Sequence, residues 1–215
     1  MKMTKLPQGF WLVAPYVAWM VLMAALPATA FAYAIRTGVV AAILLVVLWS
    51  ECRKLLLGEP HREYAVSPRS DFRSSLPSLA VGLATGIVIF IVWIAPEQVE
   101  WEWYGKWCII GEGGTQAVAE ASATMIAIRL IGSAFVISVA EELFFRKWLI
   151  GFAGFWWMVA LFAIEHDRWL VGAIAGIAYG LLYLRRGLFA AIVAHATTNL
   201  VLGLWVVRSG QWQFW

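Results

Sequence analysis

Two adjacent carboxylates, Glu141 and Glu142, lie in a run of residues that is otherwise almost wholly apolar. In a membrane-spanning helix a charge costs about 2.5–3.5 kcal/mol at the helix centre, so such residues are rare unless they pair or serve a function. Glu142 precedes Arg146 by four residues, so the two share a helix face and can form an ion pair. Glu141 is turned about 100° away and has Phe145, not a cation, at that spacing. We therefore predict that Glu142 is an ion-pair partner and that Glu141 is available for chemistry.

Three more polar side chains stand in apolar segments further along the chain. His166 follows Phe162 by four residues, and His195 precedes Asn199 by four residues within an apolar helix. The i, i+4 spacing places His195 and Asn199 on one helix face. Each of these side chains is therefore a candidate member of one polar site inside a bundle.

The depth of these groups along their helices tests whether they can meet. Counted from the turn expected near Gly151–Gly154, Glu141 lies about 15 Å along its helix and His166 about 18–22 Å along the next, at 1.5 Å per residue. Counted from the next turn, expected at Arg185-Arg186-Gly187, His195 and Asn199 lie about 12 and 18 Å along their helix. The four side chains are thus predicted to converge on one layer, from the middle of the membrane to its cytoplasmic half.

The residue types fit hydrolysis by activated water. A glutamate and a histidine around a water molecule are suited to general-base catalysis, and a second histidine with an asparagine can donate to a developing oxyanion. No Ser or Cys stands beside either His166 or His195, which disfavours a covalent route. Two histidines and a glutamate also match a hydrolytic zinc set, although the HExxH pattern is absent. The residues alone leave metal-free and zinc-dependent chemistry open.

A purely structural interpretation competes with this one. A charged helix end can extend its side chains to the membrane surface, and a lone histidine or asparagine in a span commonly bonds helix to helix. The coincidence of all these groups at one depth, beside an unpaired glutamate, favours a functional site.

The composition predicts a multi-spanning membrane protein. The chain has 215 residues, of which 62% are hydrophobic and 13% charged, with a mean hydropathy of +0.78. Soluble domains are nearer 45–50% apolar and about 25% charged. The fold class is therefore all-α, a polytopic transmembrane bundle of about seven to eight helices. No basic stripe with interleaved aromatic residues is present, so we expect no nucleic-acid partner.

Hydropathy divides the chain into helices of one domain. Residues 28–37 and 103–118 leave room for an eighth helix. We expect a single integral-membrane domain over 1–215, with N-terminal spans and loops in 1–120 and catalytic core helices in 121–208. The seven apolar segments are 10–27, 35–50, 77–95, 122–150, 153–166, 169–184 and 188–207.

Loop charge predicts the orientation. Residues 51–75 contain five Lys and Arg residues, whereas 96–121 contain one Lys and five Glu residues. The positive-inside rule places the first loop in the cytoplasm and the second outside. With seven alternating spans, the N-terminus is cytoplasmic and the C-terminus lies outside.

The polar residues form three motifs, EExxxR at 141–146, FxxxH at 162–166 and HxxxN at 195–199. Their order and spacing resemble the CPBP family of intramembrane glutamic endopeptidases, which includes type II CAAX prenyl endopeptidases and bacterial Abi proteins. Residues 165–170 and 210–215 are similar to a narrower group, the CAAX prenyl protease-related proteins associated with exosortase and PEP-CTERM protein sorting.

The resemblance implies roles for individual residues. Glu141 would activate the attacking water with help from His166, and His195 with Asn199 would hold the oxyanion. No cofactor or metal is implied. The protein would be a multi-pass protein of the bacterial inner membrane that acts on a membrane-associated protein or peptide. The implied supporting residues are Glu142, Arg146 and Phe162.

We therefore expect an intramembrane endopeptidase whose site opens toward the cytoplasmic half. A non-catalytic membrane partner in sorting or immunity, which uses the same pocket for binding, is the alternative from another class. A proton-coupled transporter would also use intramembrane Glu and His, but it should show internal repeats, and none is evident in the sequence.

Overall fold

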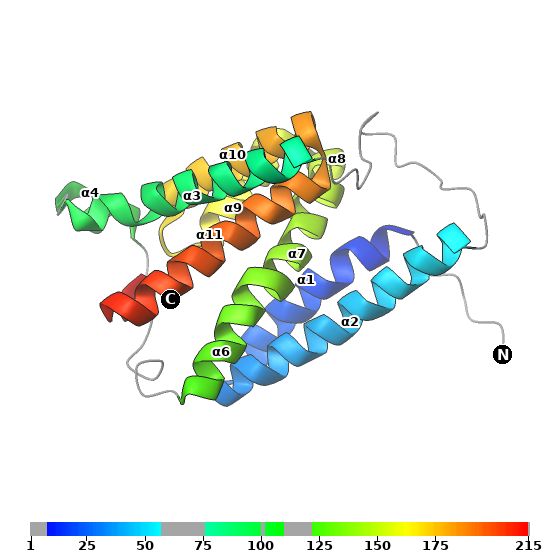
Figure 1. The fold of residues 1–215 in the computed structure, drawn as a ribbon, viewed down its shortest axis with the longest axis horizontal. Helices are drawn as coiled ribbons and strands as arrows, with labels where there is room; N and C mark the ends of the chain where they lie inside the picture. The colour runs from blue at the N-terminus through cyan, green and yellow to red at the C-terminus, as the bar shows by residue number, and fades with distance from the viewer. Residues whose placement is uncertain (1–7, 57–75, 100–101, 110–121, 215) are drawn as a thin grey trace.

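The computed structural model describes residues 8–56, 76–99, 102–109 and 122–214, and within these ranges the chain folds into eight helices with no strand (Figure 1). The all-α prediction is confirmed. Seven of the helices are α1 (Gln8–Ala25), α2 (Ala30–Leu56), α3 (Leu76–Gln98), α4 (Glu102–Cys108), α9 (Phe155–Ile164), α10 (Trp169–Arg186) and α11 (Leu188–Ser209), followed by a short 3-10 turn, η3 (Trp212–Phe214).

The eighth helix runs without interruption from 123 to 153 but changes its winding along the way (Figure 1). Two stretches of it are π-helical, with Glu142 at the start of the second and Glu141 at the end of the α-helical stretch between them. Such π segments are rare overall, and those that do occur are frequently found at functional sites. Its consecutive parts are α6 (Ala123–Ile131), η1 (Gly132–Ile137), α7 (Ser138–Glu141), η2 (Glu142–Leu149) and α8 (Ile150–Ala153).

The helices agree with the seven apolar segments, and the additional short helix α4, which begins at residue 102, overlaps the start of 103–118. The two expected turns are also present. Gly154 (φ 93°) ends the long helix before α9, and Gly187 (φ 85°) separates α10 from α11. A positive φ is strained for residues other than glycine, which explains why these turns occur at glycines.

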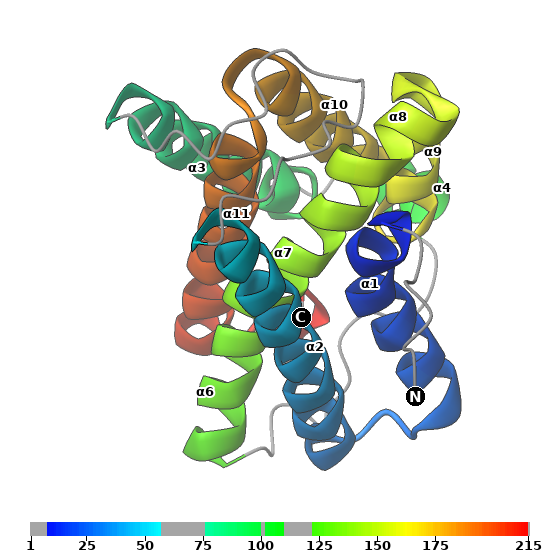
Figure 2. The ribbon, with the colours of Figure 1, turned by 90° about the vertical axis from the view of Figure 1, so that its right-hand side faces the viewer.

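The long helix 123–153 is the central element of the bundle. In Figures 1 and 2 the α1–α2 hairpin packs along one side of it, and α3, α9, α10 and α11 form the group on the other side. The helix therefore contributes its polar residues to an interface that α9 and α11 complete.

Glycines allow the helices that hold the site to approach closely. A Cβ atom on Gly86 of α3 would lie 2.5 Å from the Ala194 carbonyl oxygen of α11. On α10, a Cβ on Gly176 would lie 3.2 Å from the Phe162 ring, and one on Gly172 would lie 3.3 Å from the His166 Cβ. Small residues are typical of closely packed membrane helices, and here they bring α3 against α11 and α10 against α9.

Four helices are long and apolar enough to cross a membrane by length and composition. The helices α1 and α9 are apolar but shorter, and the ten residues of α9 extend only about 15 Å. Seven full spans are thus not required by the structure. The four candidate spans are Ala30–Trp49, Leu76–Gln98, Ala123–Ala153 and Leu188–Ser209.

Much of the charge on which the orientation depends lies outside the described residues. This applies to the side chains of 51–75 and to most of the acidic loop, residues 110–121. The cytoplasmic N-terminus therefore stays a prediction.

Candidate active site

Glu142 is the buried ionic centre of the site. Its Oε1 atom lies 3.0 Å from a terminal guanidinium nitrogen of Arg146, and both side chains are fully buried. The same oxygen lies 2.9 Å from Nδ1 of His195 on α11. The ion pair expected from the four-residue spacing is present, although its residues stand in a π-helical segment. The bond to His195 had not been expected.

Aromatic rings enclose the Arg146 guanidinium. Its central carbon lies 4.2 Å from the ring centroid of Phe162 and 5.5 Å from that of Tyr179. Contacts between a cation and a ring face are attractive, most of all where water is excluded. Phe162 thus helps to accommodate a buried charge, which agrees with a supporting position.

Glu141 stands at the end of α7 and has a different environment. Its side chain is 8% exposed, and its Oε2 atom lies 3.7 Å from Nε2 of His195. That oxygen forms no hydrogen bond with any part of the protein that the structure describes. Oε2 of Glu142 also lacks a hydrogen bond, so the two adjacent glutamates differ in their charge partners: Glu142 is paired with Arg146, and Glu141 has no Lys or Arg partner among the described residues.

His195 is held in a single orientation by three neighbours. A carboxylate oxygen accepts hydrogen bonds, so the contact with Glu142 assigns the proton to Nδ1. The imidazole stacks on the Tyr179 ring at 5.1 Å and 21°, and it meets the Phe162 ring nearly edge-on at 5.8 Å. Its Nε2 atom is thereby directed toward Glu141.

His166 lies two residues beyond the end of α9. Its Nδ1 atom lies 2.7 Å from the carbonyl oxygen of Phe162, the residue four positions earlier. A carbonyl oxygen only accepts, so Nδ1 carries the proton and Nε2 keeps its lone pair. The FxxxH spacing therefore has a local structural effect, because the Phe162 carbonyl oxygen fixes the tautomer of His166.

Asn199 uses its carboxamide to hold α11 against the long helix. Its Nδ2 atom donates to the Ser133 carbonyl oxygen at 3.0 Å and to Ser138 Oγ at 3.1 Å. Since a backbone carbonyl only accepts, these contacts fix which end of the amide is nitrogen. Both amide hydrogens are engaged, so a role at the oxyanion would require one of these bonds to be released.

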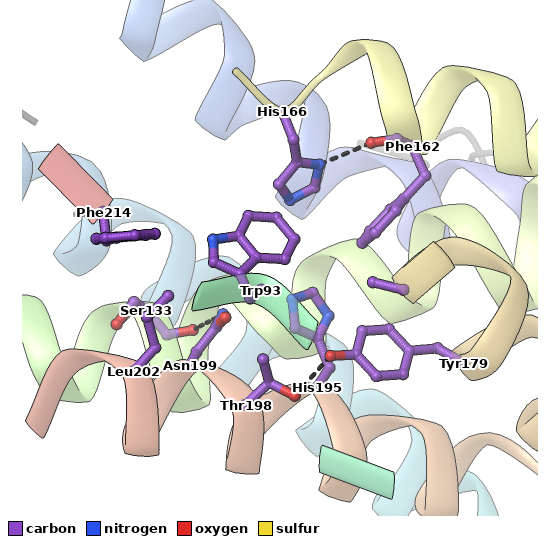
Figure 3. A pocket seen from close by; sticks show the side chains of 11 residues that line it. Trp93, Ser133, Phe162, His166, Tyr179, His195, Thr198, Asn199, Leu202 and Phe214 are labelled. Carbon is purple, nitrogen blue, oxygen red and sulfur yellow. Dashed lines mark hydrogen bonds between the residues drawn. The ribbon is translucent and has the colours of Figure 1, made fainter. Parts of the chain in front are cut away.

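A cavity of about 190 Å³ joins these elements (Figure 3). It brings together three of the four predicted catalytic side chains, His166, His195 and Asn199, while Glu141, 3.7 Å from His195, is not among the lining residues. The lining residues are Trp93, Ser133, Phe162, His166, Ala175, Tyr179, His195, Thr198, Asn199, Leu202 and Phe214.

The cavity extends away from the turn at Gly187. The close contacts of Gly82 with Ala190 and of Gly86 with Ala194 show that α3 and α11 run in parallel. The lining residues on these helices then continue from the level of His195 toward their C-terminal ends. In the predicted orientation these C-terminal ends lie in the outer half, and an opening of the site toward the cytoplasmic half stays a prediction.

The zinc alternative can be tested on the donor set. Within the described ranges, no group of three or more His, Cys, Asp or Glu side chains is arranged to hold a metal ion. A hydrolytic zinc site needs three such protein ligands around the metal. Glu141, His166 and His195 therefore do not form that set in this conformation.

Sequence reasoning did not identify several residues of the site. Tyr179 stacks on His195 and donates from its hydroxyl to Thr198 Oγ1 at 2.6 Å, and Thr198 Oγ1 lies 2.9 Å from the Gly86 carbonyl oxygen. Trp93 lines the cavity from α3. The four-residue spacing of Gly82 and Gly86 was a usable signal for the α3–α11 contact, whereas nothing in the sequence distinguished Trp93 from the other tryptophans.

Comparison with known proteins agrees with this arrangement. Residues 123–201 match the family model described as type II CAAX prenyl endopeptidase Rce1-like. This range includes the long helix and the three motifs but less than half of the chain. Comparisons with curated proteins and with solved structures found no significant match. The match supports a place for the core helices in the CAAX endopeptidase family of membrane proteases.

Proposed function

We propose that this protein is an intramembrane endopeptidase that hydrolyses a peptide bond by activated water, with Glu141 as the general base. The observation that carries the proposal is the separation of the two adjacent glutamates. Glu142 is paired through Oε1 with Arg146 and His195, whereas Glu141 has no Lys or Arg partner among the described residues and lies 3.7 Å from Nε2 of His195. A base must be free to take a proton from water, and Glu141 meets that condition.

The reaction proceeds by addition and elimination. The Glu141 carboxylate takes a proton from water while the water oxygen bonds to the carbonyl carbon, and the carbonyl electron pair moves onto its oxygen. As the tetrahedral species collapses, the C–N bond breaks and the proton passes to the departing amine. His195, fixed by Glu142, lies 3.7 Å from Glu141, and both His195 and His166 line the cavity. In the arrangement implied by the resemblance, His195 and Asn199 stabilise the oxyanion.

The substrate is a membrane-associated protein or peptide. The match to a CAAX endopeptidase model and the four apolar helices support a bilayer-embedded protein that acts at the membrane. We place it in the bacterial inner membrane with a cytoplasmic N-terminus, and the similarity of 165–170 and 210–215 to exosortase-associated proteins suggests a link to protein sorting.

The test compares strains that produce the wild type, Glu141→Gln, His166→Ala or Glu102→Gln. Glu102 is exposed on α4, so its variant is the matched control. Mass spectrometry of membrane-protein C-termini should find one processed terminus in the wild-type and Glu102→Gln strains and the unprocessed form in the other two. All variants should reach the membrane at equal levels. A Glu141→Gln strain with wild-type processing would refute catalysis and favour the non-catalytic binding partner.

A further inference from the structure

The indole nitrogen of Trp93 is a buried donor without an acceptor. Trp93 stands on α3 and lines the cavity. Its Nε1 atom is inaccessible to solvent, yet it forms no hydrogen bond within the described part of the chain. An indole N–H can only donate, and burying it unpaired costs free energy. Such an atom in a folded protein needs an explanation.

Every other donor on the polar side chains of the cavity wall is already used, when each histidine is taken as neutral. The Ser133 hydroxyl donates to the Leu130 carbonyl oxygen. The remaining pairs of donor and acceptor are Tyr179 with Thr198, Thr198 with Gly86 or Ala194, His166 with Phe162, His195 with Glu142, and Asn199 with Ser133 and Ser138. Trp93 therefore supplies the one N–H of these described lining residues that is left for a bound molecule.

The position of Trp93 suits a donor to the reacting group. Its ring meets the His166 ring nearly edge-on, with centroids 5.4 Å apart and an angle of 73° between planes. In Figure 3 the indole stands between His166 and the α11 side chains His195 and Asn199. A substrate that places its carbonyl oxygen against the indole N–H would therefore hold the reacting bond on the same cavity wall as His166 and His195.

We propose that Trp93 Nε1 donates a hydrogen bond to the carbonyl oxygen of the scissile peptide bond and stabilises the negative charge on it as water adds. The proposal rests on the proposed endopeptidase function and adds a catalytic residue to it. When the carbonyl electron pair moves onto oxygen, the bond from the fixed, buried N–H strengthens, as in other oxyanion sites. This assignment supplies the donor that Asn199, with both amide hydrogens engaged, does not offer in this conformation.

The test is Trp93→Phe, which keeps an aromatic ring and removes the N–H. The matched control is Trp205→Phe, because Trp205 packs on Phe90 and Phe214 and is not a lining residue. Purified proteins are assayed in detergent with a pool of internally quenched octapeptides, and the fastest member is used for kinetics. Trp93→Phe should lower kcat on the order of 10²-fold, the effect of losing one oxyanion donor, with KM changed less than about twofold. Trp205→Phe should match the wild type.

The outcomes distinguish a failure of the role assigned to Trp93 from a failure of the proposed endopeptidase function. Cleavage that persists in Glu141→Gln would refute the endopeptidase mechanism itself. Cleavage lost in Glu141→Gln but unchanged in Trp93→Phe, or a rise in KM alone, would overturn only the role of Trp93.

A second measurement protects against misfolding of the variant. In the ¹⁵N-tryptophan-labelled wild type, a phosphinic peptide that mimics the tetrahedral species should shift the indole N–H resonance of Trp93 downfield. That resonance is assigned by its loss in Trp93→Phe. An unmoved Trp93 signal at saturating analogue would contradict the proposed bond.

Discussion

Glu142 Oε1 and His195 Nδ1 lie 2.9 Å apart, which joins the first and third motifs by a direct hydrogen bond. The same oxygen lies 3.0 Å from a terminal guanidinium nitrogen of Arg146. Glu142 therefore does more than neutralise an arginine, because it also fixes the proton position and the ring direction of His195. A carboxylate that orients a histidine in this way is a common arrangement behind catalytic imidazoles.

Replacing Glu142 should destabilise the protein strongly. In Glu142→Gln the Arg146 charge stays buried without its counter-ion, and breaking a fully buried pair in this way costs about 3–5 kcal/mol. The measurement is thermal unfolding in detergent. The double variant Glu142→Gln with Arg146→Met removes both charges and should recover part of the loss. If the single variant unfolds at the wild-type temperature, the pair does not have the structural importance assigned to it.

Replacing Asn199 should lower the stability of the protein. Asn199→Ala removes two hydrogen bonds that join α11 to η1 and α7, so a cost of about 1–3 kcal/mol is expected. Asn199→Asp should cost more, because a carboxylate oxygen would then face the Ser133 carbonyl oxygen. Unfolding midpoints of the two variants check the order. Wild-type stability with a reduced kcat in Asn199→Ala would instead indicate the oxyanion role.

A methyl group on Gly86 should disturb the contact between α3 and α11. The added Cβ would lie 2.5 Å from the Ala194 carbonyl oxygen and 2.6 Å from Thr197 Cβ, so the helices must separate. Overpacking of this kind costs about 1–3 kcal/mol. Gly38→Ala is the matched control, since a Cβ there meets nothing within 4 Å and alanine favours a helix. Equal melting temperatures for the two variants would contradict the predicted close approach.

Metal removal should leave the activity unchanged. The described side chains do not form a three-ligand set, and the proposed mechanism uses Glu141 directly. Peptide cleavage is measured after dialysis against a chelator and again after zinc is added back. Loss of activity with the chelator and recovery with zinc would replace the glutamate mechanism by the metal-dependent one.

The sequence predicted the helices well because their signal is local. Apolar runs and the glycines at 154 and 187 define where helices start and end, and the structure follows them. It could not show that the helix around Glu141 is π-helical on both sides, because an apolar run has no marker for one winding over another. It also placed α9 over 153–166, whereas the helix has ten residues, because an apolar run continues beyond the point where the helix ends.

The candidate site was predictable only where spacing within one helix decides the contact. The pair of Glu142 with Arg146 and the bond within FxxxH are of this type. The bond from Glu142 to His195 spans 53 residues, and it depends on how the helices rotate against one another. Trp93 is 73 residues from His166 in the chain, and its position follows from the α3–α11 contact.

The π-helical stretch Gly132–Ile137 has a consequence for recognising relatives by alignment. A π turn contains about one more residue than an α turn, so a relative that lacks one residue here can return to α-helical winding while the segments on both sides keep their faces. Distant relatives can therefore carry the same catalytic face with a one-residue gap just upstream of EExxxR. Search patterns should permit that gap and keep the spacing from Glu141 to Arg146 fixed.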